Sequence, residues 1–302
     1  MSPNGPALPP TRTTARARAL TDRLSLGSGL RVSPFCLGLV ADPEIVVAAF
    51  DAGLNFFFVS ADMHWPLYEP VREGLRRLLA RGSAVREQLV VAVVSYVTQP
   101  EFCYAPFYEV LEALPGLGHV DLGVIGGSYA SDFMTRLAQY ERRPAGMRAI
   151  AASFHQREAA ATAISHGLLD LAFVRYNAAH AGAEHDLFPR VAAERRTKLF
   201  NFKSVSGYVP GARLDELGLP PGKWRPEPHD HYRFALRRPE LDGVLCALDT
   251  VAHIDALSKL LAGPELTEDE AEYLKTLAAL DAGQLTLDDA ATESARPRVE
   301  SA

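Results

Sequence analysis

The sequence contains three cysteines, and no two of them are close together. Cys36, Cys103 and Cys246 are odd in number and include no CxxC pair. This spacing does not indicate the disulfide framework on which small secreted domains depend. We therefore expect free thiols in a reducing compartment, and we predict a cytoplasmic location.

Long apolar runs and clustered positive charge are also missing. No stretch approaches the ~18 apolar residues of a membrane-spanning helix, and the N-terminus lacks the apolar core of a secretory signal. The formal net charge is −6, without a basic stripe, so we expect neither a membrane nor nucleic acid as a partner. Lysine is scarce, with five residues against 26 arginines, a composition that suggests a bacterial source.

The two ends of the chain differ in composition from the rest. Residues 1–20 are rich in Pro, Thr and Arg, which predicts a disordered N-terminal segment. Residues 289–302 read as a polar C-terminal tail. Apolar residues make up 48% of the 302-residue chain, enough for a sizeable core, and we assign residues 21–288 to one domain.

Within that domain, short apolar runs alternate with amphipathic stretches of helical period. The eight runs are residues 34–40, 54–60, 88–95, 120–127, 147–153, 170–177, 197–204 and 242–249. Strands that are apolar nearly throughout and separated by helices predict a parallel sheet buried on both faces. Eight such units favour a closed (β/α)8 TIM barrel. A doubly wound open sheet is the alternative, but no GxGxxG follows the first run.

Two segments break this rhythm. Residues 22–33 alternate polar and apolar around a Gly-Ser-Gly turn, which predicts a short β-hairpin. Residues 208–232 are rich in Pro and Gly and read as a long loop over the barrel mouth. Within it, His229 and His231 flank Asp230 at a helix start, where capping and solvent contact are expected.

Polar side chains gather where the predicted strands end, which is where barrels of this kind carry their sites. These residues are Asp62, His64, Ser95, Tyr96, Ser153, His155, Arg175, Asn177, His180, Lys203, Ser204, Asp249 and Thr250. Ser95 and Asp249 are equally well explained as helix N-caps. Arg175 and Asn177 share one side of their strand, but periodicity alone does not say which side faces the barrel interior.

Several motifs, in order, resemble those of the aldo-keto reductases. They are RLSLGSGLRVSPFCLGL, AFDAGLNFFFVSADMHWPLYEPVREGL, HVDLGVIGG, RAIAASFH, VRYN and LTEDEAEYLKTLAAL. The resemblance covers about residues 22–282 and implies a barrel with an N-terminal hairpin plugging its base. The segments VRYNAAHAGAEHDLFP and HYRFALRRPELDGVL are most similar to a divergent bacterial branch of that family.

The resemblance implies NADPH-dependent carbonyl reduction by an Asp, Tyr, Lys and His tetrad, yet this sequence lacks all four residues. The matching positions hold Phe58 or Val59 for the Asp, His64 for the Tyr, Val94 or Ser95 for the Lys, and Gly126 for the His. Without a Lys to lower the pKa of a Tyr and a polar wall for the alkoxide, the usual proton donor cannot operate. We expect no ordinary carbonyl reductase.

The residues that the resemblance assigns to the cofactor are also largely replaced. The Ser-Asn pair for the carboxamide reads Ser153-Phe154, and Phe173 replaces a Gln. The adenine-binding Asn falls near Leu257, and Asp249 would repel a 2′-phosphate. Phe202 remains where a nicotinamide would stack. We therefore predict no cofactor, with NADPH as the alternative.

Three chemistries remain open for the polar groups at the strand ends. In the first, His64 is a general acid and base oriented by Asp62, with Arg175 or Lys203 holding a carboxylate or phosphate. In the second, Lys203 forms an imine with the substrate. In the third, His64, His155 and His180 bind a metal, although no HxH or HExxH spacing supports it, and we predict no metal.

The sequence thus predicts an aldo-keto-reductase-like barrel repurposed as a cofactor-independent isomerase, lyase or cyclase. Its substrate would be a small polar metabolite or an intermediate of specialised metabolism. The candidate catalytic residues are His64, Asp62 and Lys203, and the candidate substrate-binding residues are Trp65, Tyr96, His155, Arg175, Asn177 and His180. The alternatives are an NAD(P)H-dependent oxidoreductase with substituted catalytic residues and a non-catalytic binding protein. The oligomeric state is not predicted.

Overall fold

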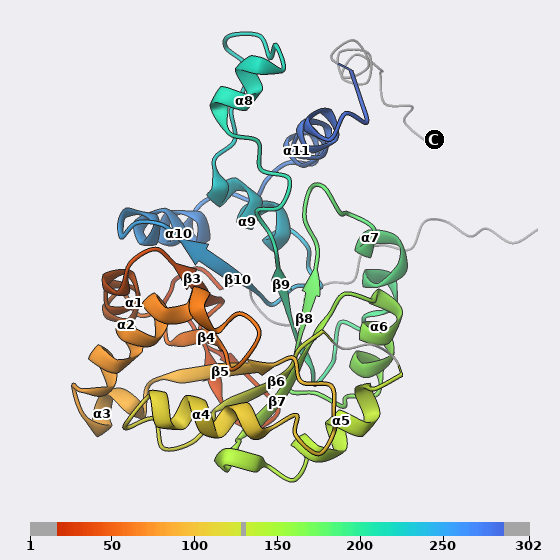
Figure 1. The fold of residues 1–302 in the computed structure, drawn as a ribbon. Coiled ribbons are helices and arrows are strands. Elements are labelled where there is room, and N and C mark those ends of the chain that lie inside the picture. The colour runs from red at the N-terminus through yellow and green to blue at the C-terminus, as the bar shows by residue number, and fades with distance from the viewer. Residues whose placement is uncertain (1–16, 128–130, 287–302) are drawn as a thin grey trace, which may run out of the picture.

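The computed structural model describes residues 17–127 and 131–286. Eight parallel strands close into a barrel in the order β10-β3-β4-β5-β6-β7-β8-β9, with helices around the outside (Figure 1). The strands are β3 (Phe35–Val40), β4 (Phe56–Ser60), β5 (Val90–Ser95), β6 (Leu122–Ile125), β7 (Ala149–Phe154), β8 (Leu171–Arg175), β9 (Lys198–Phe202) and β10 (Gly243–Leu248). Each predicted apolar run overlaps one of these strands, so the (β/α)8 barrel is confirmed.

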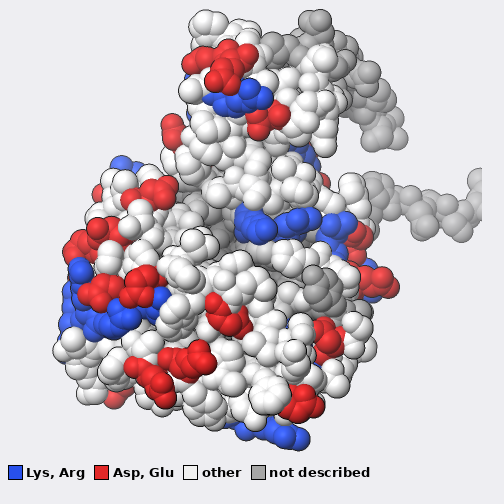
Figure 2. Space-filling view, in the orientation of Figure 1, with Lys and Arg blue, Asp and Glu red and all other residues white. Residues whose placement is uncertain are grey.

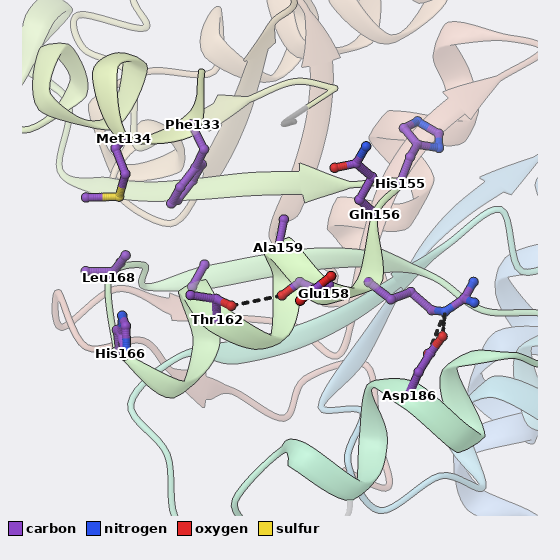
Figure 3. Close-up of a pocket in the computed structure, with 12 residues that line it drawn as sticks. Phe133, Met134, His155, Gln156, Glu158, Ala159, Thr162, His166, Leu168 and Asp186 are labelled. Atoms are coloured by element: carbon purple, nitrogen blue, oxygen red, sulfur yellow. Dashed lines mark hydrogen bonds and ion pairs between the residues drawn. The ribbon is translucent and has the colours of Figure 1, made fainter. Parts of the chain in front are cut away.

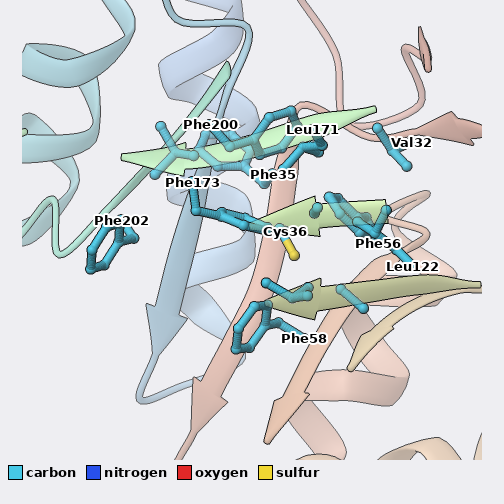
Figure 4. Packing of buried hydrophobic residues seen from close by; sticks show 14 of the residues in the cluster. Val32, Phe35, Cys36, Phe56, Phe58, Leu122, Leu171, Phe173, Phe200 and Phe202 are labelled. Atoms are coloured by element: carbon cyan, nitrogen blue, oxygen red, sulfur yellow. The ribbon is translucent and has the colours of Figure 1, made fainter. Parts of the chain in front are cut away.

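Aromatic rings fill the interior of the barrel. Phe56 on β4 packs edge-on against Phe200 on β9, with 5.6 Å between ring centroids. One layer nearer the carboxyl ends, Phe58 packs in the same way against Phe173 on β8 at 5.5 Å. Figure 4 shows these side chains gathered among the barrel strands. The interior is therefore a packed core, and a ligand can enter only above it.

Every second barrel strand is preceded by a residue whose side chain accepts a hydrogen bond. The donor is a backbone N–H in, or just before, the neighbouring strand that comes earlier in the chain. The acceptors are Asn55 before β4, Asp121 before β6, Asp170 before β8 and Asp242 before β10. They accept hydrogen bonds of 2.8–3.0 Å from the backbone N–H groups of Ser33, Val91, Ile150 and Leu199, respectively. We call these four residues the strand-start acceptors. The carboxylates among them also contact arginines, which offsets the cost of burying their charge.

The predicted hairpin lies at the amino ends of the strands. Its strands β1 (Leu24–Ser25) and β2 (Arg31–Val32) pair antiparallel. Leu26, Leu30 and Val32 are buried in the main core. The Nδ2 of Asn55, just before β4, donates to the carbonyl of Arg31 at 2.9 Å. The hairpin therefore covers the base of the barrel and leaves the opposite end for the site.

Helices connect the strands. They are α1 (Pro43–Asp51), α2 (Glu69–Leu79), α3 (Ser83–Arg86), α4 (Ala105–Ala113), α5 (Phe133–Tyr140), α6 (Arg157–Ser165), α7 (Ala183–Asp186), α8 (Gly211–Glu216), α9 (Pro228–Leu236), α10 (Ala252–Ala262) and α11 (Glu268–Asp281). Short 3-10 turns are η1 (Trp65–Tyr68), η2 (Pro144–Gly146) and η3 (Phe188–Arg190). The sequence explains their ends: α11, for example, starts with a capping box in which Thr267 and Glu270 satisfy each other's backbone N–H.

Residues 208–232 do not form the predicted loop over the mouth. They include α8, which in Figure 1 stands away from the barrel beside α11. The indole of Trp224 stacks on Tyr273 of α11, with 5.8 Å between ring centroids. A small separate cluster of buried side chains joins the two segments: Val209, Leu214, Leu219 and Leu277. The content of Pro and Gly led to the prediction of an irregular loop. The segment instead contains a short helix, and its Leu214 and Leu219 pack with Leu277 of α11.

The ends of the chain fall mostly outside the described residues. Of the predicted disordered segment 1–20, only residues 17–20 are described, and Leu20 among them is 3% exposed and packs in the core. The ordered domain therefore begins by residue 20. The predicted polar tail, residues 289–302, lies wholly outside the described part. None of the helices that the structure describes has the length and apolar character required to cross a bilayer.

Candidate functional site

A cavity of about 460 Å³ opens at the carboxyl ends of the barrel strands. Phe58, Phe173 and Phe202 line it and give it a largely apolar interior. The lining residues with polar side-chain atoms are His64, Tyr68, Tyr96, Ser153, His155, Lys203, Ser204 and Tyr232. On the face drawn in Figure 2, the central hollow is bordered on one side by Lys and Arg side chains. The cavity can therefore hold an apolar body beside a few polar groups.

Asp62 fastens the end of β4 to the end of β5. Its Oδ2 accepts hydrogen bonds from the Ser95 hydroxyl at 2.9 Å and from the Tyr96 N–H at 2.7 Å. Its Oδ1 accepts from the N–H of Met63 at 2.6 Å. The ring of Tyr96 packs edge-on against the imidazole of His64, with centroids 5.3 Å apart. Asp62 therefore positions His64 through Tyr96, whereas the sequence suggested direct contact between the carboxylate and the imidazole.

The turn after His64 places Tyr68, which was not predicted, in the cavity lining, and it places the predicted Trp65 outside it. Trp65 does not line the cavity; its ring lies over the guanidinium of Arg72, 3.6 Å from the Arg72 Cζ to the ring centroid. Tyr68 lines the cavity instead, packed against Phe58. Burial raises the pKa of the Tyr68 hydroxyl, which stays protonated and can act as a hydrogen-bond donor. Its position one helical turn after His64 was the available signal.

Two cations stand on the other side of the mouth. Arg175 ends β8 and Lys203 follows β9, strands that lie opposite β4 and β5 in the closed barrel. No hydrogen bond or ion pair joins the side chain of Arg175 or Lys203 to any residue that the structure describes. Loss of hydration lowers the pKa of nearby His155, and the charges of Lys203 and Arg175 lower it further. This side of the mouth therefore has positive charge that lacks a counterion among the described residues.

Asn177 holds this cationic side together. Its Nδ2 donates to the backbone carbonyl of Lys203 at 2.9 Å, and its Oδ1 lies 3.2 Å from Nδ1 of His180. Lys203 has a φ of 57°, in the left-handed region that residues other than glycine adopt only when their surroundings compensate. The pKa of His180 is lowered by loss of hydration and by Arg175 and Lys203. The residues predicted from strand six and strand seven thus form one group.

The structure also settles which face of β8 points inward. Phe173 lines the cavity, and strand alternation puts Arg175 on the same side of β8, although Arg175 is not itself one of the lining residues. Tyr176 points outward, packs on Phe188 and Phe234, and donates its hydroxyl hydrogen to Glu184 at 2.5 Å. Glu184 is therefore a partner of Tyr176 and Lys275, and it does not pair with His180 as its spacing allowed.

The predicted histidines do not gather into a metal site. Among the residues that the structure describes, no group of three or more His, Cys, Asp or Glu side chains is placed to hold a metal ion. His64 lies against Tyr96, whereas His155 packs edge-on against Phe202 at 5.3 Å. His231 is buried in α9 rather than exposed to solvent, and the cap of that helix is formed by Glu227 and Asp230.

The cavity has only part of what a nicotinamide would need. Phe202 and Ser153 line it, but Phe154, in place of the family's Asn, is buried against Phe133. The side-chain amides of Asn177 and Asn201 bind backbone carbonyls, those of Lys203 and Tyr176, respectively. No described lining residue supplies the amide that the carboxamide requires. The lining therefore offers a nicotinamide a ring and a hydroxyl group but no side-chain amide.

Comparison with known proteins finds similarity of fold. No family model matches the sequence, and no curated protein matches it either. Among solved structures, the holo form of the aldo-keto reductase AKR11C1 from Bacillus halodurans is similar over 85% of this chain and 96% of its own, with 14% identity and a TM-score of 0.59. The thermostable aldo-keto reductase Tm1743, solved with the inhibitor epalrestat, is similar over 84% of this chain and 99% of its own, with 17% identity and a TM-score of 0.61. The chain therefore has the barrel fold of the aldo-keto reductases.

Proposed function

We propose that this chain is a cofactor-independent enzyme that moves protons on a small anionic metabolite, as isomerases, lyases and cyclases do. The observation that supports this proposal is the division of the mouth into two sides. Arg175 and Lys203 have no anionic partner among the described residues, and His64 and Tyr96 lie at the opposite strands. An anionic group held by the cations would direct the rest of a small substrate toward the imidazole.

In this proposal His64 accepts a proton from the carbon next to a carbonyl and returns it to another position. An imidazole suits both steps because its ring nitrogens can accept a proton and donate it again. Tyr68 and Tyr96 would donate hydrogen bonds to the oxygen on which negative charge develops. Lys203 is exposed and not enclosed by apolar side chains, so its role is electrostatic, and imine formation is less well supported.

A reductase with substituted residues is the second candidate. Phe202 lines the cavity at the position where the family resemblance places the nicotinamide, and the similar solved structures are reductases. His64 would then be the proton donor. The two candidates differ in one measurable property, the binding of NADPH.

Deuterium exchange tests the proposal directly. Phosphorylated and carboxylated carbonyl compounds are incubated with the protein in D2O, and NMR follows loss of the proton next to the carbonyl. We expect exchange with at least one compound, and His64→Gln should slow it by about 10²- to 10⁴-fold. The exposed His185, which lines neither the mouth cavity nor the outer groove, provides the control variant His185→Gln. Saturable micromolar binding of NADPH with turnover of a carbonyl substrate would instead establish the reductase.

Anion binding should strengthen as the pH falls. The pKa values of His155 and His180 are lowered by loss of hydration and by neighbouring cations. A bound anion offsets those cations and favours the protonated imidazoles, so binding takes up protons. We expect ethyl sulfate, whose own charge is constant, to bind about fivefold more tightly at pH 5.5 than at pH 8, as measured by calorimetry. In the double variant His155→Gln and His180→Gln most of this pH dependence should disappear.

We also propose that the protein is located in the cytoplasm. Cys36, Cys103 and Cys246 are all free and buried, which fits the cytoplasmic location predicted from their spacing. The bacterial source and a role in specialised metabolism remain predictions from composition and resemblance. The proposed partner is a small molecule, and neither nucleic acid nor a membrane is invoked.

A further inference from the structure

We propose that the substrate carries an unbranched apolar chain, and that this chain lies in a groove between α5 and α6 outside the barrel. This inference rests on the proposed function, because it takes the anion site at the mouth as the place of the substrate's charged group. It adds a second binding site and assigns the substrate to the class of amphipathic anions.

The groove has a volume of about 900 Å³ (Figure 3). Phe133 and Met134 of α5 form one wall, and Ala159 of α6 with Leu168 forms the other. Met134 is 58% exposed, a large apolar side chain facing solvent beside this groove. Covering such surface is favourable by roughly 25 cal/mol per Å². The groove therefore favours an apolar occupant.

His155 connects the groove to the mouth cavity. It lines both of them, and Figure 3 shows His155 and Gln156 at one end of the groove, with His166 and Leu168 at the other. The two cavities therefore adjoin at His155, and the proposed ligand would pass this residue to occupy both. The α6 helix beside the groove has 9 residues, a length of about 13 Å, which accommodates an extended chain of several carbons.

The charges at the groove determine the orientation of the ligand. Asp186 is paired with Arg157 at 2.6 Å, and the exposed Glu158 adds a negative charge. A second anionic group in the groove would be repelled, whereas Arg175 and Lys203 attract one at the mouth. The charged group therefore lies inside the mouth and the apolar chain points outward between the helices.

Binding of n-alkyl sulfates tests this arrangement, with calorimetry from ethyl to octyl sulfate below the concentrations at which they form micelles. We expect the affinity to rise by about two- to fourfold per added methylene, as burial of each CH2 predicts. Ala159→Trp should remove most of this gain and leave ethyl sulfate binding unchanged. Met134→Glu should do the same without filling the groove, because a hydrocarbon chain that covers the new carboxylate removes its hydration. The control Ala262→Trp, at an exposed position of α10 outside both cavities, should keep the full gain.

The outcomes separate the two proposals. If ethyl sulfate binds and the affinity does not change with chain length, the groove is not part of the site and this inference is overturned alone. The same holds if Ala159→Trp and Met134→Glu both keep the full gain. If no alkyl sulfate binds, or if Arg175→Ala with Lys203→Ala leaves ethyl sulfate binding intact, the anion site fails and the proposed function fails with it.

Discussion

Replacing Arg136 by methionine should lower the free energy of unfolding by about 3–5 kcal/mol, because this substitution removes one partner of a buried charged network. Arg136 is fully buried, and its guanidinium donates to the carbonyls of Gly126 and Ser95 at 3.0 Å each. It also pairs with Asp132 at 3.4 Å. Methionine fills much of the volume but leaves two buried carbonyls without this donor.

Guanidinium chloride unfolding, followed by circular dichroism, measures this loss. Arg142→Met, at an exposed position just after the same helix, is the matched control and should change the stability by less than about 0.5 kcal/mol. A loss below about 1 kcal/mol for Arg136→Met would show that the two carbonyls find other donors.

Acidification should destabilise the protein through His231. The imidazole is 1% exposed, and its Nδ1 has no hydrogen-bond partner among the described residues. Burial lowers its pKa to about 4, although Asp230 opposes this shift. The unfolded chain therefore binds a proton first, near pH 6.5, and the free energy of unfolding falls from there down to about pH 4. The full loss is on the order of 3 kcal/mol.

His231→Phe removes the titrating group and keeps a ring where Tyr208 packs edge-on at 5.7 Å. We expect unfolding free energies at pH 4.5 and pH 7.5 to lie closer together in this variant than in the natural chain. The control is His166→Gln, which removes an exposed imidazole and should leave the pH dependence unchanged. An identical acid loss in His231→Phe and in the natural chain would place the responsible group elsewhere.

The sequence was sufficient for the fold because the fold depends on local patterns that repeat. Eight apolar runs of strand length alternate with helical stretches, and no run depends on a distant residue for its interpretation. Residues 208–232 were misjudged because their helix, α8, is short and gains its burial from α11, some 60 residues later in the chain. Burial of this kind is invisible to periodicity within one segment.

The site was predictable as a set of strand ends but not as a set of contacts. The rule that barrels carry function at the carboxyl ends selected His64, His155 and Lys203, which all line the cavity. It could not show that Asp62 binds the end of the next strand, because that contact joins residues 33 and 34 positions apart. It also missed the wall formed by Tyr68 and Tyr232, which come from a turn and a helix.

The four strand-start acceptors have a consequence for how the barrel acquires its shape. A closed barrel requires its strands to be staggered by a fixed total shear, and the tilt and the diameter follow from that shear. Each acceptor ties one strand, or in the case of Asn55 the segment just before β3, to the following even-numbered strand, so the stagger is specified at four points around the ring. The width of the mouth, and with it the span between His64 and Lys203, is therefore set at the opposite end of the barrel.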